Sequence, residues 1–69
     1  MITNKSTGDK LIELRKNKGK SRADVAKAVG VSISAIAMYE RGERQPKDEI
    51  KVKIATYFKK SVSSIFFAV

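Results

Sequence analysis

The chain has 69 residues, and its 15 basic and 7 acidic residues give a formal net charge of +8. A chain of this length forms one small domain that buries only about 60% of the surface exposed by its unfolded form. It contains no cysteine and no histidine, which excludes disulfides and argues against a zinc site or a histidine general base. We therefore expect no metal and no cofactor. Since no grouping of nucleophile, base and orienting residue is visible, we do not expect an enzyme.

No apolar run approaches the length of a membrane span, and the N-terminal segment lacks the apolar core of a signal peptide. We therefore expect a soluble cytoplasmic protein that does not contact a membrane. The strong positive charge favours a polyanionic partner, most simply nucleic acid.

The N-terminal segment, residues 1–8, is polar and aperiodic. It is expected to be a flexible arm ahead of a domain that spans residues 9–69. The first helix is predicted from Asp9 to Lys18, because Leu11 and Leu14 share one helical face and a glycine follows the basic C-terminal turn.

Two short helices joined by a tight turn are predicted over residues 22–41. Ser21 and Ser32 are the N-cap candidates, and Gly30 between the helices suits a turn that requires a positive φ. Gly42 then ends the second helix. The apolar residues that share the inward faces are Val25, Ala26, Val29, Ile36 and Tyr39. This arrangement is typical of a helix-turn-helix.

A fourth helix is predicted from Asp48 to about Lys59, after a polar loop that ends at Pro46. Ser61 is expected to cap a last short helix, residues 62–66. No segment alternates between apolar and polar residues as a strand would. The sequence therefore predicts an all-α fold with five helices and short loops.

Residues 19–46 read GKSRADVAKAVGVSISAIAMYERGERQP, and this stretch resembles the phage repressor and Cro-like (Xre-type) helix-turn-helix DNA-binding domain. The resemblance extends from Leu11 to Phe66. The residues that match the family's small, turn and core positions are Ala26, Gly30, Ile36 and Tyr39. The ERG run at residues 40–42, the proline at position 46 and the closing SVSSIF at residues 61–66 also match. It implies a compact, lambda-repressor-like domain that binds operator DNA, usually as a dimer. One departure is Lys59, which stands where the family often has glycine; a non-glycine residue in a left-handed helix cap costs about 1 kcal/mol.

The third helix is expected to lie in the major groove, with its N-terminal residues nearest the base edges. Ile36 and Tyr39 are expected to point into the core, so the opposite face of the third helix points toward solvent and is available to DNA. The residues that match the family's base-facing positions are Ser32, Ile33, Ser34, Ala37 and Met38. Serine can hydrogen-bond to several bases, whereas the apolar side chains suit a thymine methyl group. We therefore expect weak direct readout weighted toward thymine methyls; the alternative is that the exposed apolar side chains contact a protein.

Phosphate contacts are predicted from residues on either side of the third helix, namely Lys20, Ser21, Arg22, Arg41, Arg44, Gln45 and Lys47. Five other lysines are interpreted as solvated surface charges: Lys5, Lys10, Lys27, Lys51 and Lys53. The resemblance also implies that Arg15 of the first helix forms a partly buried ion pair with Glu40. The alternative is that the two are independent surface charges.

The apolar C-terminal end is the expected dimer interface, formed by Phe66, Phe67 and Val69. The resemblance points to a two-fold dimer, whose recognition helices would lie about 34 Å apart on a palindromic operator; a frayed apolar tail is the alternative. The sequence thus predicts a sequence-specific regulator of transcription that binds double-stranded DNA, most simply a repressor. The alternative is an antitoxin-type module of the same fold, which neutralises a partner protein and autoregulates its operon.

Overall fold

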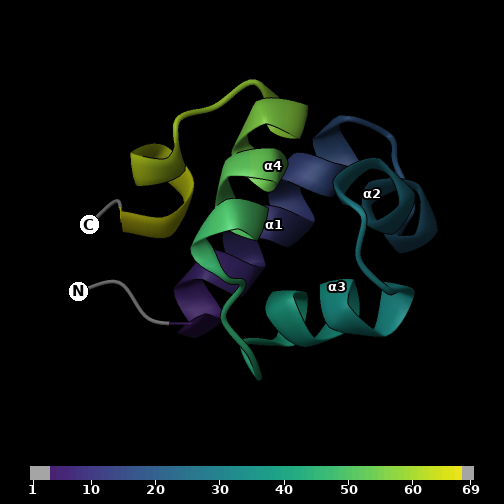
Figure 1. Cartoon of the computed structure of the whole chain (residues 1–69), viewed down its shortest axis with the longest axis horizontal. Coiled ribbons are helices and arrows are strands. Elements are labelled where there is room, and N and C mark those ends of the chain that lie inside the picture. The colour runs from purple at the N-terminus through teal and green to yellow at the C-terminus, as the bar shows by residue number, and fades with distance from the viewer. Residues whose placement is uncertain (1–3, 68–69) are drawn as a thin grey trace.

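The computed structural model describes residues 4–67 of the chain. This part contains four α-helices and a terminal π-helix, joined by short loops. In chain order they are α1 (Asn4–Asn17), α2 (Arg22–Val29), α3 (Ile33–Arg41), α4 (Asp48–Phe58) and η1 (Ser63–Phe67). Helix α1 packs against α3 and η1, and α2 packs against α3 and α4. Figure 1 shows α2 and α3 on one side of the molecule and η1 on the other. The predicted all-α fold is confirmed.

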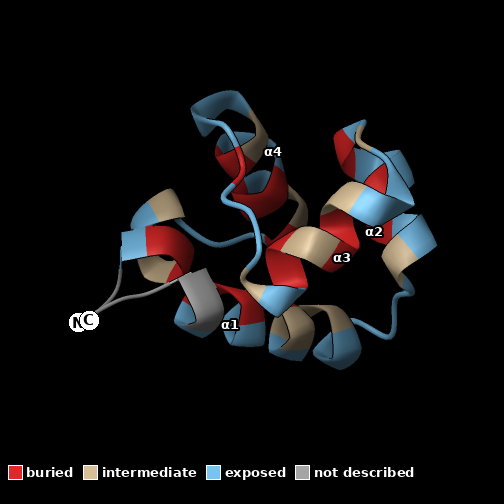
Figure 2. Ribbon diagram, turned by 90° about the horizontal axis from the view of Figure 1, so that it is seen from below, coloured by how far each residue is buried: buried red, intermediate tan, exposed pale blue. Residues whose placement is uncertain are grey.

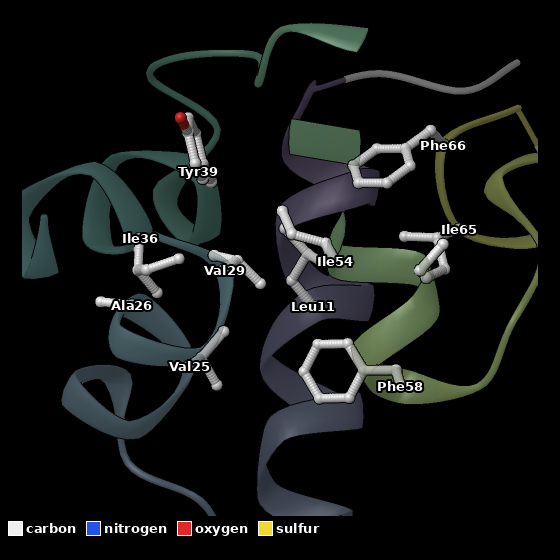
Figure 3. Close-up of a cluster of buried hydrophobic side chains, with 11 residues drawn as sticks. Leu11, Val25, Ala26, Val29, Ile36, Tyr39, Ile54, Phe58, Ile65 and Phe66 are labelled. Atoms are coloured by element: carbon white, nitrogen blue, oxygen red, sulfur yellow. The ribbon is translucent and has the colours of Figure 1, made fainter. Parts of the chain in front are cut away.

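One apolar core joins all five elements (Figure 3). Its buried members are Leu11, Val25, Ala26, Val29, Ile36, Tyr39, Ile54, Ala55, Phe58, Ile65 and Phe66. Every inward residue predicted for α2 and α3 belongs to this cluster, so the two helices are held rigidly to the rest of the domain. Within residues 4–67, no helix combines the length and the apolarity needed to cross a membrane.

Helix α1 begins at Asn4, five residues earlier than predicted, so a flexible arm over residues 1–8 is wrong for residues 4–8. Residues 1–3 lie outside the described part. The reason is a tertiary contact: Thr7 is 2% exposed, and Gly8 lies against the backbone carbonyls of Tyr39 and Glu40. This contact favours helix in a polar segment whose own sequence pattern gives no such indication.

The other helix boundaries follow local signals that the sequence contains. Lys59 ends α4 with φ +56° and ψ +43°, so this lysine occupies the left-handed cap conformation expected at its position. Ser61 accepts a hydrogen bond from the backbone N–H of Ser64 at 3.1 Å, and so caps the last helical segment. That segment is a π-helix rather than an α-helix, and it turns the buried Ile65 and Phe66 into the core.

Candidate nucleic-acid interface

Glycine and two helix caps fix the turn between α2 and α3. Gly30 has φ +77°, and its backbone N–H and that of Val31 donate to the carbonyl of Ala26 at 2.9 and 3.0 Å. Ser32 then caps α3 by accepting a hydrogen bond from the backbone N–H of Ala35 at 3.0 Å. These local bonds fix the tight turn that joins the two helices, as in a helix-turn-helix.

A capping box begins α2. The hydroxyl oxygen of Ser21 accepts from the backbone N–H of Asp24 at 3.1 Å, and the Asp24 carboxylate accepts from the backbone N–H of Ser21 at 3.0 Å. The hydrogen bond from the Ser21 backbone is the main reason that the pKa of Asp24 is lowered, and the Ser21 side chain lowers it further. Lys20 and Ser21 are both exposed, so the N-terminal end of α2 is accessible from solvent.

The outward side of α3 is most exposed at its N-terminal end, and its last residue, Arg41, is exposed as well. Ile33 is 55% exposed, Ser32 and Ser34 are exposed, and Met38 is half-buried. Figure 2 shows the helix passing from exposed at its N-terminal end to mostly buried further along. The part of α3 that can approach a ligand is therefore small, with one large apolar side chain and two hydroxyl groups.

The prediction that Ala37 faces the bases is wrong. This residue is only 9% exposed, and Ile36, Tyr39 and Glu40 around it are also buried. The cause is that α3 packs against both α1 and α2, which encloses the C-terminal half of the helix on more than one side. A single inward direction on the helical wheel does not describe a helix held between two neighbours.

The buried carboxylate of Glu40 ties three helices together. Arg15 of α1 donates from Nε to Glu40 Oε2 at 2.7 Å and from Nη2 to Oε1 at 3.3 Å. Arg22 of α2 donates from Nε to Glu40 Oε1 at 2.8 Å. The structure thus brings together Arg15 and Glu40, the pair that the resemblance implied, and adds a second arginine. No sequence spacing indicates that Arg22 shares this carboxylate, because the contact depends on how α2 crosses α3.

The basic residues predicted to flank the recognition helix are all at the surface. Arg41 forms two hydrogen bonds of 3.0 Å with the carboxylate of Glu43, from Nε and from Nη2. This pair raises the pKa of Arg41 and lowers the pKa of Glu43, in both cases first through the side-chain hydrogen bond. The residues that follow are exposed: Arg44, Gln45 and Lys47. In the free protein, Arg41 is therefore engaged by an acid, and these three remain accessible.

The C-terminal apolar end divides into a buried and an exposed part. Phe66 is 1% exposed and belongs to the core of its own chain, so its assignment to a dimer interface is wrong. The π-helix directs Phe66 inward, and it leaves Phe67 57% exposed. Val69 lies outside the described residues.

Lys51 was interpreted as a solvated charge, but it is 9% exposed. Its Nζ lies 5.6 Å from the ring centroid of Phe66 and 5.0 Å from that of Phe67, and 3.8 Å from an Asp48 carboxylate oxygen. The ammonium group therefore keeps electrostatic partners although its stem is buried. The sequence signal for this contact is the position of Lys51 on the inward side of α4, three residues before Ile54.

The sequence profile of the Helix-turn-helix family matches residues 11–65, which include α2, the turn and α3. Among solved structures, the restriction-modification controller protein C.AhdI from Aeromonas hydrophila is similar, with a TM-score of 0.85 and 30% identity. The similarity covers 91% of this chain and 96% of that chain. No curated protein sequence matches the chain.

Two structures of the clp gene regulator ClgR from Corynebacterium glutamicum share the fold at 23% identity, with TM-scores of 0.85 and 0.81. Each covers 94% of this chain, and the similarity covers 69% and 84% of the respective ClgR chains. The profile match, the capped turn and the exposed N-terminal half of α3 agree with one another. The chain belongs to the phage repressor and Cro-like (Xre-type) helix-turn-helix family of DNA-binding transcription regulators.

Proposed function

We propose that this protein is a sequence-specific transcription regulator that binds a palindromic operator as a dimer and acts as a repressor by occluding a promoter. The observation that carries the proposal is the exposed N-terminal half of α3 with basic residues on both sides of it. The similarity to a restriction-modification controller protein supports a regulatory role.

Base recognition in this proposal comes from a short, mostly apolar surface. Ile33 and the half-buried Met38 offer apolar contact to thymine methyl groups, and the Ser32 and Ser34 hydroxyls can donate to or accept from base edges. None of these side chains forms the two-bond contact that arginine makes with guanine. The operator is therefore expected to be rich in thymine at the positions read by α3.

Phosphate recognition supplies most of the affinity. Lys20, Ser21 and Arg22 lie at the N-terminal end of α2, where backbone N–H groups favour an anion. A second group lies at the end of α3 and in the loop after it: Arg41, Arg44, Gln45 and Lys47. The two groups would contact the DNA backbone on either side of the groove that holds α3, and each phosphate contact contributes about one to the salt slope.

Dimerisation is expected to use the exposed Phe67. We infer that the partner surface includes Phe67, an aromatic residue of η1 that is 57% exposed. A two-fold dimer would present two α3 helices about 34 Å apart, one helical turn of DNA. Half-sites with that spacing, related by inversion, are therefore the expected arrangement of the operator.

Selection of bound sequences from a random pool of duplex DNA, at two salt concentrations, tests this proposal. We expect an inverted repeat with thymine-rich half-sites and an affinity that falls steeply with salt. An Ile33→Ala variant should lose preference at the thymine positions while keeping the salt dependence, because it removes no phosphate contact. Recovery of no enriched sequence, or of a site dominated by guanines read from the centre of α3, would contradict the proposal.

The second candidate is an antitoxin-type module that binds a partner protein and autoregulates its operon. The exposed Phe67 favours this candidate as much as it favours a homodimer. Co-expression with the product of the neighbouring reading frame distinguishes the two functions. A stable complex that a Phe67→Ser exchange disrupts would support the antitoxin, whereas a self-associating protein with no co-purifying chain supports the homodimeric repressor.

A further inference from the structure

We propose that Glu40 is a positioning residue for DNA binding: this buried acid holds the guanidinium group of Arg22 in place so that its terminal N–H groups face a DNA phosphate. The inference rests on the proposed function, because it concerns how one predicted phosphate contact is made. It gives Glu40, whose negative charge alone would repel DNA, a role in DNA binding.

The geometry fixes the carboxylate first. The Glu40 side chain is 2% exposed, and Arg15 donates to both of its oxygens, at 2.7 and 3.3 Å. Arg15 also donates from Nη1 to the backbone carbonyl of Lys20 at 3.0 Å, so its own guanidinium group is held at both ends. The carboxylate of Glu40 therefore has little freedom to rotate, and it offers a fixed acceptor to α2.

Arg22 contacts this acceptor with one edge only. Its Nε donates to Glu40 Oε1 at 2.8 Å, and its side chain remains 40% exposed. Among the residues that the structure describes, its Nη1 and Nη2 groups have no acceptor. A guanidinium group carries several N–H donors in a fixed plane, so a bond at Nε sets the direction of all the others. Arg22 is thus oriented by the protein and still has donors for a phosphate.

Preordering of this kind improves binding because a free arginine side chain loses rotamer freedom when it grips a ligand. The effect competes with simple charge repulsion, since Glu40 adds a negative charge close to the expected DNA backbone. The two effects predict opposite signs for the neutral variant Glu40→Gln. Repulsion alone predicts tighter binding when the charge is removed, whereas positioning predicts weaker binding.

The experiment measures DNA affinity and its salt slope for the wild type, Glu40→Gln, Arg22→Gln and the double variant, on the operator recovered by selection. We expect each single exchange to weaken binding on the order of tenfold and to reduce the salt slope by about one. We expect the double variant to bind no more weakly than Arg22→Gln, because both exchanges remove the same contact. Additive losses, or tighter binding by Glu40→Gln, would overturn the inference.

Two further variants keep the test decisive. Glu13→Gln removes one acidic charge from the exposed surface of α1 and serves as the matched control; it should not weaken binding. Arg22→Lys leaves the Arg15–Glu40 contact and the net charge intact, so it remains informative even if Glu40→Gln unfolds. Because one ammonium group keeps the charge but cannot reproduce the oriented fork, we expect it to bind more weakly than the wild type while keeping more of the salt slope than Arg22→Gln. Binding equal to that of the wild type would overturn the inference.

The proposed function and this inference fail in different ways. A wild-type protein that binds no selected DNA contradicts both. A wild-type protein that binds DNA, with unchanged affinity in folded Glu40→Gln, overturns only the positioning role. Circular dichroism at the binding temperature establishes that each variant is folded, because loss of a partner from a buried ion pair is itself destabilising.

Discussion

At the scale of single residues, Lys59 adopts a conformation that favours glycine. Its φ of +56° costs a non-glycine residue roughly 1–2 kcal/mol, which a glycine at this position would not incur. Glycine also has greater freedom in the unfolded chain, and this freedom offsets part of the stability that the exchange would add. We therefore expect Lys59→Gly to raise the free energy of unfolding by about 0.5–1 kcal/mol, measured as a higher urea midpoint with an unchanged m-value. Lys60→Gly is the control and should not stabilise, since Lys60 does not have a positive φ. Equal effects of the two exchanges would contradict the argument.

Asp24 makes the stability of the domain dependent on acid pH. Its pKa is lowered below the ordinary value of 3.8, mainly because its carboxylate accepts a hydrogen bond from the Ser21 backbone. A lowered folded-state pKa adds stability that is fully present above the unfolded value and is lost as the pH falls through the folded value. We expect the stability difference between the wild type and Asp24→Asn to shrink as the pH falls below 3.8, measured by urea unfolding at a series of pH values.

A Ser21→Ala variant provides the internal comparison for this acid dependence. It removes the hydroxyl cap and is expected to cost about 1 kcal/mol at neutral pH. It keeps the backbone N–H that is the main cause of the Asp24 shift. The part of the acid dependence that Asp24 contributes should therefore persist in Ser21→Ala and be missing from Asp24→Asn, which keeps the part contributed by Glu43. Loss of the Asp24 part in both variants would assign it to the hydroxyl group.

At the scale of helices, Gly8 determines how closely α1 approaches α3. A Cβ atom at this position would lie 2.7 Å from the carbonyl oxygen of Tyr39 and would clash with that of Glu40. Helix propensity alone favours Gly8→Ala by about 1 kcal/mol, whereas overpacking against backbone costs roughly 1–3 kcal/mol. We expect Gly8→Ala to lower the thermal midpoint, since neither carbonyl can move without shifting its helix.

Lys16→Ala, on the exposed side of α1, is the matched control for Gly8→Ala. It should change stability by less than about 0.5 kcal/mol. A Gly8→Ala variant that is more stable than the wild type would mean that propensity outweighs the contact.

How well the sequence predicts a helix depends on whether local signals or contacts with other helices determine its bounds. The bounds of α2 and α3 follow from Ser21, Gly30 and Ser32, whose effects act within a few residues and are visible in the sequence. The start of α1 and the burial of Ala37 depend on which helices meet, and no local pattern contains that information. The same holds for the candidate site: its exposed serines and lysines were identifiable, but the Arg22–Glu40 contact was not.

At the scale of the whole molecule, self-association should depend on Phe67. We expect the wild-type protein to sediment as a dimer at micromolar concentration and Phe67→Ser to sediment as a monomer of similar stability, because the exposed ring contributes little to the core. Operator affinity should fall with the loss of the dimer, since two half-sites are then bound independently.

Val52→Ser is the control for this prediction, because Val52 is 54% exposed on α4 and is not part of the C-terminal end. It should leave sedimentation unchanged. A Phe67→Ser protein that sediments like the wild type would assign dimerisation to another surface.

The exposed residues that begin α3 and the buried residues in its middle differ in how freely they can be substituted. Ile33 and Ser34 are outside the apolar core, whereas Ile36 and Tyr39 belong to it. Glu40 is buried beside them and forms an ion pair with Arg15. Substitutions at the first two positions should therefore have little effect on folding, and on the proposed function they are the ones expected to alter the preferred operator. A library randomised at these two positions should therefore remain largely folded.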